Sequence, residues 1–328
     1  MFRIAATLIT LAAALTAHAQ TASTGSGQAW PAKPVRMVVP FPAGGTSDIL
    51  ARMIGPRLTE VWGPQIIVDN RPGANGNIGG EMVARAAPDG YTMILMDVGN
   101  LAISPSVFAK MPFDILKDFA PVTMVSYSPH LLSTHPSLPV RSVKELITFT
   151  RARPGKLNVP VGLGGAPQFA AMSFATRTGL DWVYLPTKGG GAASVMAVAV
   201  GEGDVLFLGM LQSLPHVKNG KLRMLAVSSA QRDPAVPETP TIAETPGLEG
   251  FVTGSWQGIL APANTPPDIV NKMNAEVARI LKLPDLREKL ASQGTMPMTS
   301  TPQEMGQWLA AEKERWAKLV KQTGFKLE

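Results

Sequence analysis

The chain has 328 residues, of which 30 are Lys or Arg, 24 are Asp or Glu and none is Cys. This length allows a large hydrophobic core and favours two domains over one. The small basic excess is spread along the chain without a run of basic residues, which argues against nucleic-acid binding and suits a small anionic ligand. The absence of Cys excludes disulfides, a thiol nucleophile and any metal site that uses Cys.

The first residues have the pattern of a secretory signal peptide. Arg3 precedes the apolar run Ile4–Leu15, and Ala17-His18-Ala19 has the small-residue spacing of a cleavage site. We therefore predict a signal peptide at 1–19 with cleavage after Ala19, a flexible leader at 20–29 and a periplasmic mature protein. The apolar run is too short to span a membrane and no later run reaches about 18 apolar residues, so membrane insertion is not expected.

The first predicted strand, Val35–Val39, leads into a loop rich in Pro and Gly and then into a helical pattern. Such a loop directs backbone N–H groups and the positive end of the helix dipole at one point, which favours an anion. An ordinary turn between strand and helix would have the same pattern, so this stretch alone leaves both interpretations open. The candidate ligand-binding residues here are Phe41, Pro42, Ala43, Gly44, Gly45, Thr46, Ser47 and Asp48.

Along the rest of the chain, short apolar runs alternate with helical patterns. This rhythm predicts parallel sheets covered by helices on both faces. Gly55-Pro56 should kink the first helix or break it in two. The predicted strands are Val35–Val39, Gln65–Asp69, Tyr91–Met96, Val122–Val125, Leu157–Val161, Trp182–Leu185, Asp204–Leu208 and Arg223–Val227. The predicted helices are 48–62, 78–87, 142–152, 167–178, 190–200, 211–218, 266–282, 285–293 and 302–321.

These strands are more than we expect in a single sheet, so the sequence predicts a two-domain α/β fold with two mostly parallel sheets flanked by helices. The first sheet ends near Met96, the second extends from about Val125 to Val227, and the chain then returns to the first domain. The predicted domains are therefore 30–124 with 255–328, and 125–254. The two crossings form a hinge, and ligands of such folds bind in the cleft at the carboxyl ends of the strands.

Several ordered stretches resemble one known family. Each stretch is weak by itself, but together they cover nearly all of the mature chain in the expected order. They are Trp30–Pro34, Val39–Asp48, Asn70–Gly79, Ala87–Thr92, Lys117–Val122, Leu214–Arg223, Pro237–Glu244 and Trp256–Pro262. In these stretches the chain is similar to the extracytoplasmic substrate-binding proteins of tripartite tricarboxylate transporters, also called the Bug or TctC family.

The resemblance implies a hinged, monomeric periplasmic binding protein with a type II-like fold, which needs no cofactor or metal and delivers a small organic carboxylate to membrane permease subunits. In the family, the first loop contributes to a clamp on the ligand carboxylate, partly through ordered water. On this chain the implied donors are the backbone amides of Gly44, Gly45, Thr46 and Ser47. Asp48 is negative, so we expect a helix cap or loop brace in preference to an anion ligand.

A second sequence of strand, Gly loop and helix start resembles the other half of the clamp. Family members often have Ser and Thr through this loop and a His soon after the helix begins, and this chain has neither. Pro167 suits the first helical position, and the loop amides before it remain available. The candidate residues here are Gly162, Leu163, Gly164, Gly165, Ala166 and Gln168.

Three further departures from the family pattern remove polar groups. Asp97–Leu101 replaces a stretch rich in Thr and Ser, Thr187 stands where Tyr is common, and Leu208 stands where a second acid is common. Gly99, Lys188 and Leu208 are the candidate ligand-binding residues of these segments. The loss of polar groups predicts a ligand with one anchored carboxylate and a larger apolar or aromatic body, in preference to a compact amino acid or citrate.

The remaining motifs are weak signals. Gly73–Gly79 has the wrong glycine spacing for a dinucleotide loop, and we expect Asn75 or Asn77 to face the ligand. Lys188 precedes glycines without a Walker pattern, so it pairs with a carboxylate or is a solvated loop lysine. Trp256 flanks the ligand or packs the hinge.

No pattern indicates a reactive centre. His130, His135 and His216 lack the spacing of metal ligands, and the Ser within Gly254–Gly258 is one position early for a nucleophile elbow. The leading hypothesis is therefore a non-catalytic carboxylate-binding protein. A ligand-sensing partner of a signalling receptor and, more weakly, a periplasmic hydrolase are the alternatives.

Overall fold

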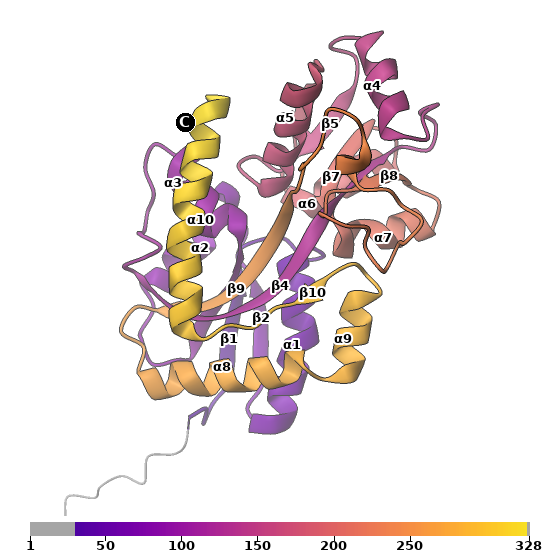
Figure 1. The fold of residues 1–328 in the computed structure, drawn as a ribbon. Coiled ribbons are helices and arrows are strands. Elements are labelled where there is room, and N and C mark those ends of the chain that lie inside the picture. Colours follow the sequence, from indigo (N-terminus) through magenta and orange to yellow (C-terminus); the bar gives the residue numbers. More distant parts are fainter. Residues whose placement is uncertain (1–29, 327–328) are drawn as a thin grey trace, which may run out of the picture.

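The computed structural model describes residues 30–326, so the predicted signal peptide, its cleavage site and the leader lie outside the described residues. Figure 1 shows two lobes joined by two long strands. These strands are β4 (Phe119–Thr134) and β9 (Gly254–Pro262), which pair antiparallel from Phe119 opposite Pro262 to Pro129 opposite Gly254. The predicted α/β fold class is confirmed.

The first lobe is built on β1 (Val35–Val39), which pairs in parallel with β2 (Ile66–Asn70) and β3 (Thr92–Asp97). β3 pairs antiparallel with β9, which connects this lobe to the hinge strands. The other elements of the lobe are α1 (Thr46–Trp62), α2 (Asn77–Ala84), α3 (Ser104–Val107), α8 (Pro267–Leu281), α9 (Pro284–Ala291), β10 (Met296–Pro297) and α10 (Pro302–Thr323).

The second lobe extends from the far end of β4. There β7 (Val205–Gly209) and β8 (Arg223–Val227) each pair antiparallel with β4. A separate parallel pair is formed by β5 (Asn158–Val161) and β6 (Val183–Pro186). The helices of this lobe are α4 (Val143–Arg151), α5 (Ala166–Thr178), α6 (Gly190–Ala199) and α7 (Met210–Lys218).

The expectation of two mostly parallel sheets was wrong in detail. Within the described residues, one eight-stranded sheet extends through both lobes, and all pairings of β4 and β9 are antiparallel. The physical reason is that β4 leaves the first lobe and β9 returns to it along the same path. The predicted strand Val122–Val125 is accordingly the middle of the much longer β4. The domain boundaries near 125 and 254 fall in β4 and at the start of β9, and remain a prediction.

The first helix does not break at Gly55-Pro56, contrary to the sequence expectation. α1 continues to Trp62 with Pro56 inside it. Gly55 lies against β2, where an added Cβ would be 3.4 Å from Ile66 Cγ2, and the Thr59 hydroxyl donates to the Gly55 carbonyl. Tertiary packing on the sheet therefore outweighs the loss of one backbone donor.

The first lobe buries both faces of its sheet, as the helix pattern predicted. Along β3, Met93 and Leu95 belong to the core beneath α1 and α8, whereas Ile94 and Met96 belong to the core beneath α10. This alternation follows from the period of two along a strand. In the second lobe, stacked and tilted rings fill the core, namely Phe174, Trp182, Phe207 and Phe251.

Candidate functional site

Two loops with the same internal structure face the gap between the lobes. In the first, the Gly44 amide donates to Asp48 Oδ2 at 2.9 Å, and in the second the Gly164 amide donates to Gln168 Oε1 at 2.7 Å. Gly44 and Gly164 have positive φ of 85° and 74°, a backbone conformation that suits glycine. In each loop the next glycine is the N-cap of a helix, α1 or α5, and has no side-chain cap. The helix N-termini therefore keep backbone donors for another acceptor.

The side chains of Asp48 and Gln168 brace these loops. Asp48 Oδ1 also accepts from Arg52 Nε and Asn70 Nδ2, each at 3.0 Å. Burial raises the pKa of Asp48, but the hydrogen bonds from Arg52, Gly44 and Asn70 outweigh burial and the net pKa is lowered. The Gly44 and Gly164 amides, which donate to these braces, are consequently directed away from a ligand. The amides of Thr46 and Ser47 have no such acceptor among the described residues.

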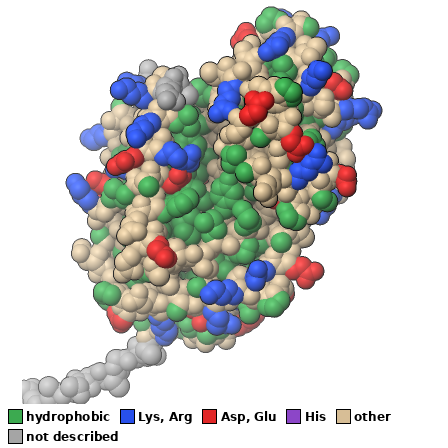
Figure 2. Space-filling view, in the orientation of Figure 1, with side chains coloured by type: hydrophobic (Ala, Val, Ile, Leu, Met, Phe, Trp, Pro, Cys, Tyr) green, Lys and Arg blue, Asp and Glu red, His purple; other side chains and the backbone are tan. Residues whose placement is uncertain are grey.

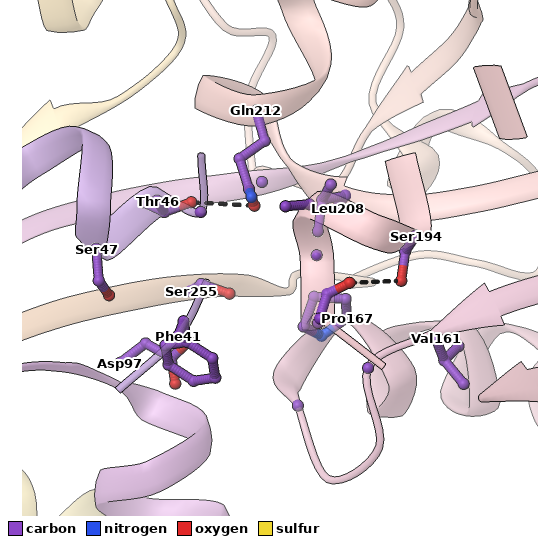
Figure 3. Close-up of a pocket in the computed structure, with 18 of the residues that line it drawn as sticks. Phe41, Thr46, Ser47, Asp97, Val161, Pro167, Ser194, Leu208, Gln212 and Ser255 are labelled. Carbon is purple, nitrogen blue, oxygen red and sulfur yellow. Dashed lines mark hydrogen bonds between the residues drawn. The ribbon is translucent and has the colours of Figure 1, made fainter. Parts of the chain in front are cut away.

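A cavity of about 70 Å³ lies between the two loops. Figure 3 shows its walls, with Phe41, Thr46, Ser47, Asp97 and Ser255 on one side and Val161, Pro167, Ser194 and Leu208 on the other. The predicted site residues that line it are Phe41, Gly45, Thr46, Ser47, Gly162, Gly165 and Leu208.

An apolar vestibule of about 710 Å³ adjoins the cavity and shares Phe41, Asn75 and Gly162 with it. Figure 2 shows hydrophobic side chains lining the hollow between the lobes. The vestibule contains the predicted residues Pro42, Leu163 and Lys188. Its other walls include Pro40, Pro72, Ala74, Phe108 and Pro186.

The remaining predicted residues line neither the cavity nor the vestibule. Asn77 is buried with its Oδ1 unpaired, and the neighbouring Asn75 lines both cavity and vestibule in its place. Gly99 approaches the second loop so closely that an added Cβ would lie 3.6 Å from Gly165 Cα. The predicted residues that line neither space are Ala43, Gly44, Asp48, Asn77, Gly99, Gly164, Ala166 and Gln168.

Sequence reasoning missed most of the polar side chains of the cavity. They come from the hinge strands, from the end of β3 and from α6 and α7. The sequence marked the segments of Asp97 and Ser255 only as a departure from the family pattern and as an incomplete nucleophile motif. Gln212 also links the lobes, because its Oε1 accepts from the Thr46 hydroxyl at 3.2 Å and its Nε2 donates to the Gly44 carbonyl at 3.4 Å. The missed polar residues are Asp97, Ser128, Ser194, Gln212, Ser255 and Gln257.

The cavity contains a negative side chain and no positive one. Among the described residues that line it, none is Lys or Arg, and Asp97 is the one charged residue. Lys188 lies in the vestibule instead. An anion in the cavity must therefore be held by backbone amides, hydroxyls and side-chain amides.

A Ser and a His meet at the cavity, but they do not form a nucleophile and base. His130 Nε2 lies 2.9 Å from Ser255 Oγ, and its Nδ1 lies 3.0 Å from Thr253 Oγ1. Burial lowers the pKa of His130 to about 3, so the imidazole is neutral, and a hydroxyl stands where a triad has a carboxylate. The pair instead joins β4 to β9 at the hinge.

Among the described residues, no three His, Asp or Glu side chains gather as a metal site would require. Within the same residues, none of the helices combines the length and hydropathy needed to cross a bilayer.

Known proteins share this sequence and this fold. BugT of Bordetella pertussis is 36% identical over 315 residues, covering 95% of this chain and 96% of BugT. The structure of R. palustris Rpa4515 with adipate has a TM-score of 0.88 and 38% identity, covering 90% of this chain and 99% of that one. MatC from Rhodopseudomonas palustris, solved with bound malate, has a TM-score of 0.81 and 31% identity, covering 88% of this chain and 99% of that one.

The match to a family model agrees with these relatives. Residues 50–325 match the family described as tripartite tricarboxylate transporter family receptor. The resemblance noted from the sequence is therefore confirmed, and the hydrolase alternative is set aside. The chain belongs to this family of periplasmic solute-binding proteins, which are not enzymes.

Proposed function

We propose that the cleft captures one small organic carboxylate with an apolar body and that the loaded protein presents it to the permease of a tripartite-type transporter. The observation that carries this proposal is the pair of braced loops, which direct the uncapped N-termini of α1 and α5 at a cavity without Lys or Arg. Adipate on Rpa4515 and malate on MatC support a carboxylate as the ligand class.

The shape of the site supports an apolar ligand body. The cavity has room for a compact polar head, and the vestibule beside it is walled largely by Pro, Phe and Ala side chains. Burial of an apolar body there would contribute roughly 25 cal/mol for each Å² removed from water. The amides of Thr46 and Ser47 would then hold the carboxylate, while Phe41 and Leu163 contact the body.

A calorimetric and thermal-shift panel on the purified protein tests the ligand class. We expect hydrocinnamate and other apolar-bodied carboxylates to stabilise the protein more than malate or citrate does. Strong stabilisation by citrate together with no response to apolar carboxylates would contradict the proposal.

Gly45→Val tests the position of the anchor. A Cβ at Gly45 would lie 3.5 Å from the Pro42 carbonyl oxygen and 3.9 Å from Gln212 Nε2, so the fold accepts it while the branched side chain crowds the donors at the cavity. We expect a loss of carboxylate binding of at least about tenfold with an unchanged unfolding midpoint. Gly306→Val in α10, away from the cavity, is the matched control. Normal affinity in Gly45→Val would place the site elsewhere.

Export and oligomeric state form a separate part of the proposal. We infer that the mature chain begins at Gln20, after cleavage behind Ala19, and acts as a periplasmic monomer. N-terminal sequencing of the protein from a periplasmic extract and sedimentation analysis check these two points. Co-purification with a sensor kinase in place of a permease would favour the signalling alternative.

A further inference from the structure

Asp97 is an acid without a cationic partner inside the cavity. It ends β3, and its Oδ1 accepts from the amides of Gly99 at 2.8 Å and Asn100 at 3.3 Å. No salt bridge among the described residues includes Asp97. Its second carboxylate oxygen is therefore available to a donor in the cavity.

The hinge strands add further polar groups beside it. Asp97 stands opposite Gln257 in the antiparallel pairing of β3 with β9, so the two side chains share one face of the sheet. Gln257 Oε1 accepts from the Ser126 hydroxyl at 2.6 Å, and Ser255 lies two residues earlier on that face. Figure 3 shows Asp97 and Ser255 on the same wall as Ser47.

The electrostatic environment determines which ligand group suits this wall. Burial raises the pKa of Asp97 to about 6, so the side chain is mainly ionised at neutral pH but poorly compensated. His130, behind Ser255, is neutral, and Lys188 is the one cationic side chain among the described residues that line the vestibule. A second carboxylate in the cavity would meet like charge at low dielectric, whereas a protonated nitrogen would gain a charge-assisted hydrogen bond.

We propose that Asp97 determines specificity by accepting a hydrogen bond from a protonated nitrogen next to the ligand carboxylate. This inference rests on the proposed function, because the amides of Thr46 and Ser47 hold the carboxylate. The cavity of about 70 Å³ holds both charges, so nitrogen and carboxylate are close together. The ligand class is then an α-amino carboxylate whose apolar side chain extends into the vestibule.

Three probes with the same benzyl body isolate this interaction. L-phenylalanine carries an ammonium group beside its carboxylate, hydrocinnamate carries a hydrogen there, and benzylmalonate carries a second carboxylate. The wild-type protein should bind phenylalanine about tenfold to a hundredfold more tightly than hydrocinnamate, and benzylmalonate most weakly. Titration calorimetry at neutral pH measures all three.

Asp97→Asn should remove the preference for phenylalanine and improve binding of benzylmalonate. The Asn Oδ1 retains the acceptor for the Gly99 and Asn100 amides, so the turn after β3 is kept, and thermal unfolding verifies the fold. Asp89→Asn is the matched control, because Asp89 likewise accepts a backbone amide two residues later, from Tyr91 at 3.0 Å, but lies exposed outside the cavity.

The outcomes separate the two proposals. Equal or tighter binding of hydrocinnamate or benzylmalonate than of phenylalanine by the wild-type protein overturns the role of Asp97 and leaves the carboxylate proposal standing. An unchanged phenylalanine preference in Asp97→Asn does the same. If none of the three probes binds, the apolar-bodied carboxylate is wrong, and the role of Asp97 fails with it.

Discussion

At the scale of single residues, the site separates bracing from binding. Asp48 and Gln168 hold the two loops by accepting the amides of Gly44 and Gly164, and they leave the later helix-start amides available. His130 performs a similar supporting task at the hinge, where it contacts Thr253 and Ser255. Buried polar side chains with complete hydrogen bonding specify one arrangement of the backbone around them.

His130 should make the protein acid-sensitive. Burial lowers its pKa to about 3 from an ordinary value of 6.5, so below pH 6.5 the unfolded chain binds a proton that the folded chain does not. The stability supplied by the neutral imidazole is therefore present above pH 6.5 and is lost as the pH falls toward 3. Urea denaturation between pH 7 and pH 3 should show that the free energy of unfolding falls less steeply with pH for His130→Asn than for wild type. Equal slopes in the two proteins would contradict a stabilising role for the neutral imidazole.

At the scale of elements, α10 fastens the hinge strand β9 to the first lobe. Glu312 on α10 accepts from Trp256 Nε1 at 2.9 Å, from Trp316 Nε1 at 3.1 Å and from Arg315 Nε at 2.6 Å. Burial raises the pKa of Glu312, but the hydrogen bonds from Arg315 and the two indoles outweigh it and the net pKa is lowered. Trp256 thus packs the hinge, which was one of the two roles expected for it, and it does not line the cavity.

Removing this carboxylate should loosen the contact between helix and strand. Glu312→Ala leaves two buried indole N–H groups without an acceptor, at roughly 1 to 3 kcal/mol each. We expect a loss of about 2 to 6 kcal/mol in the free energy of unfolding, and a smaller loss for Glu312→Gln. Guanidinium denaturation measures it, with the exposed Glu314→Ala of the same helix as control. Equal midpoints for Glu312→Ala and Glu314→Ala would refute the role.

At the scale of the whole molecule, two lobes meet over one cavity. The hinge consists of β4 and β9. The lobes contact each other through Thr46 and Gln212, through the approach of Gly99 to the second loop, and through Phe169 of α5 against Trp316 of α10. Such a geometry allows closure about the hinge strands, in which a ligand that touches both loops stabilises the compact form.

Closure should be visible in solution scattering. We expect the radius of gyration to fall when a binding carboxylate is added, because the ligand draws both loops onto one group. Gln212→Ala removes the contact between the lobes at Thr46 and should weaken both the compaction and the affinity, whereas Gln231→Ala, on the exposed surface, should behave as wild type. Identical curves with and without a bound ligand would exclude hinge closure.

Features of the fold that depend on consecutive residues could be predicted from the sequence, and features that depend on distant packing partners could not. The first loop could be found from Val39 to Asp48 because its strand, glycines and helix start are consecutive, and the loop lies at the cavity. The antiparallel direction of β9 and the continuity of α1 through Pro56 could not be found, because each depends on packing partners distant in the chain. Asn75 and Asn77 illustrate the intermediate case, since the predicted segment lies at the cavity and only the structure shows which of the two side chains lines it.

The sequence by itself determined the family, the α/β class and the two glycine loops, because these depend on short patterns in which neighbouring residues act together. The tertiary structure decided which side chains complete the cavity. Asp97, Ser128, Gln212 and Gln257 come from four different elements and meet only because two strands cross between the lobes. The physical reason is that a strand pattern specifies which face is buried, while the register between distant strands specifies what stands opposite.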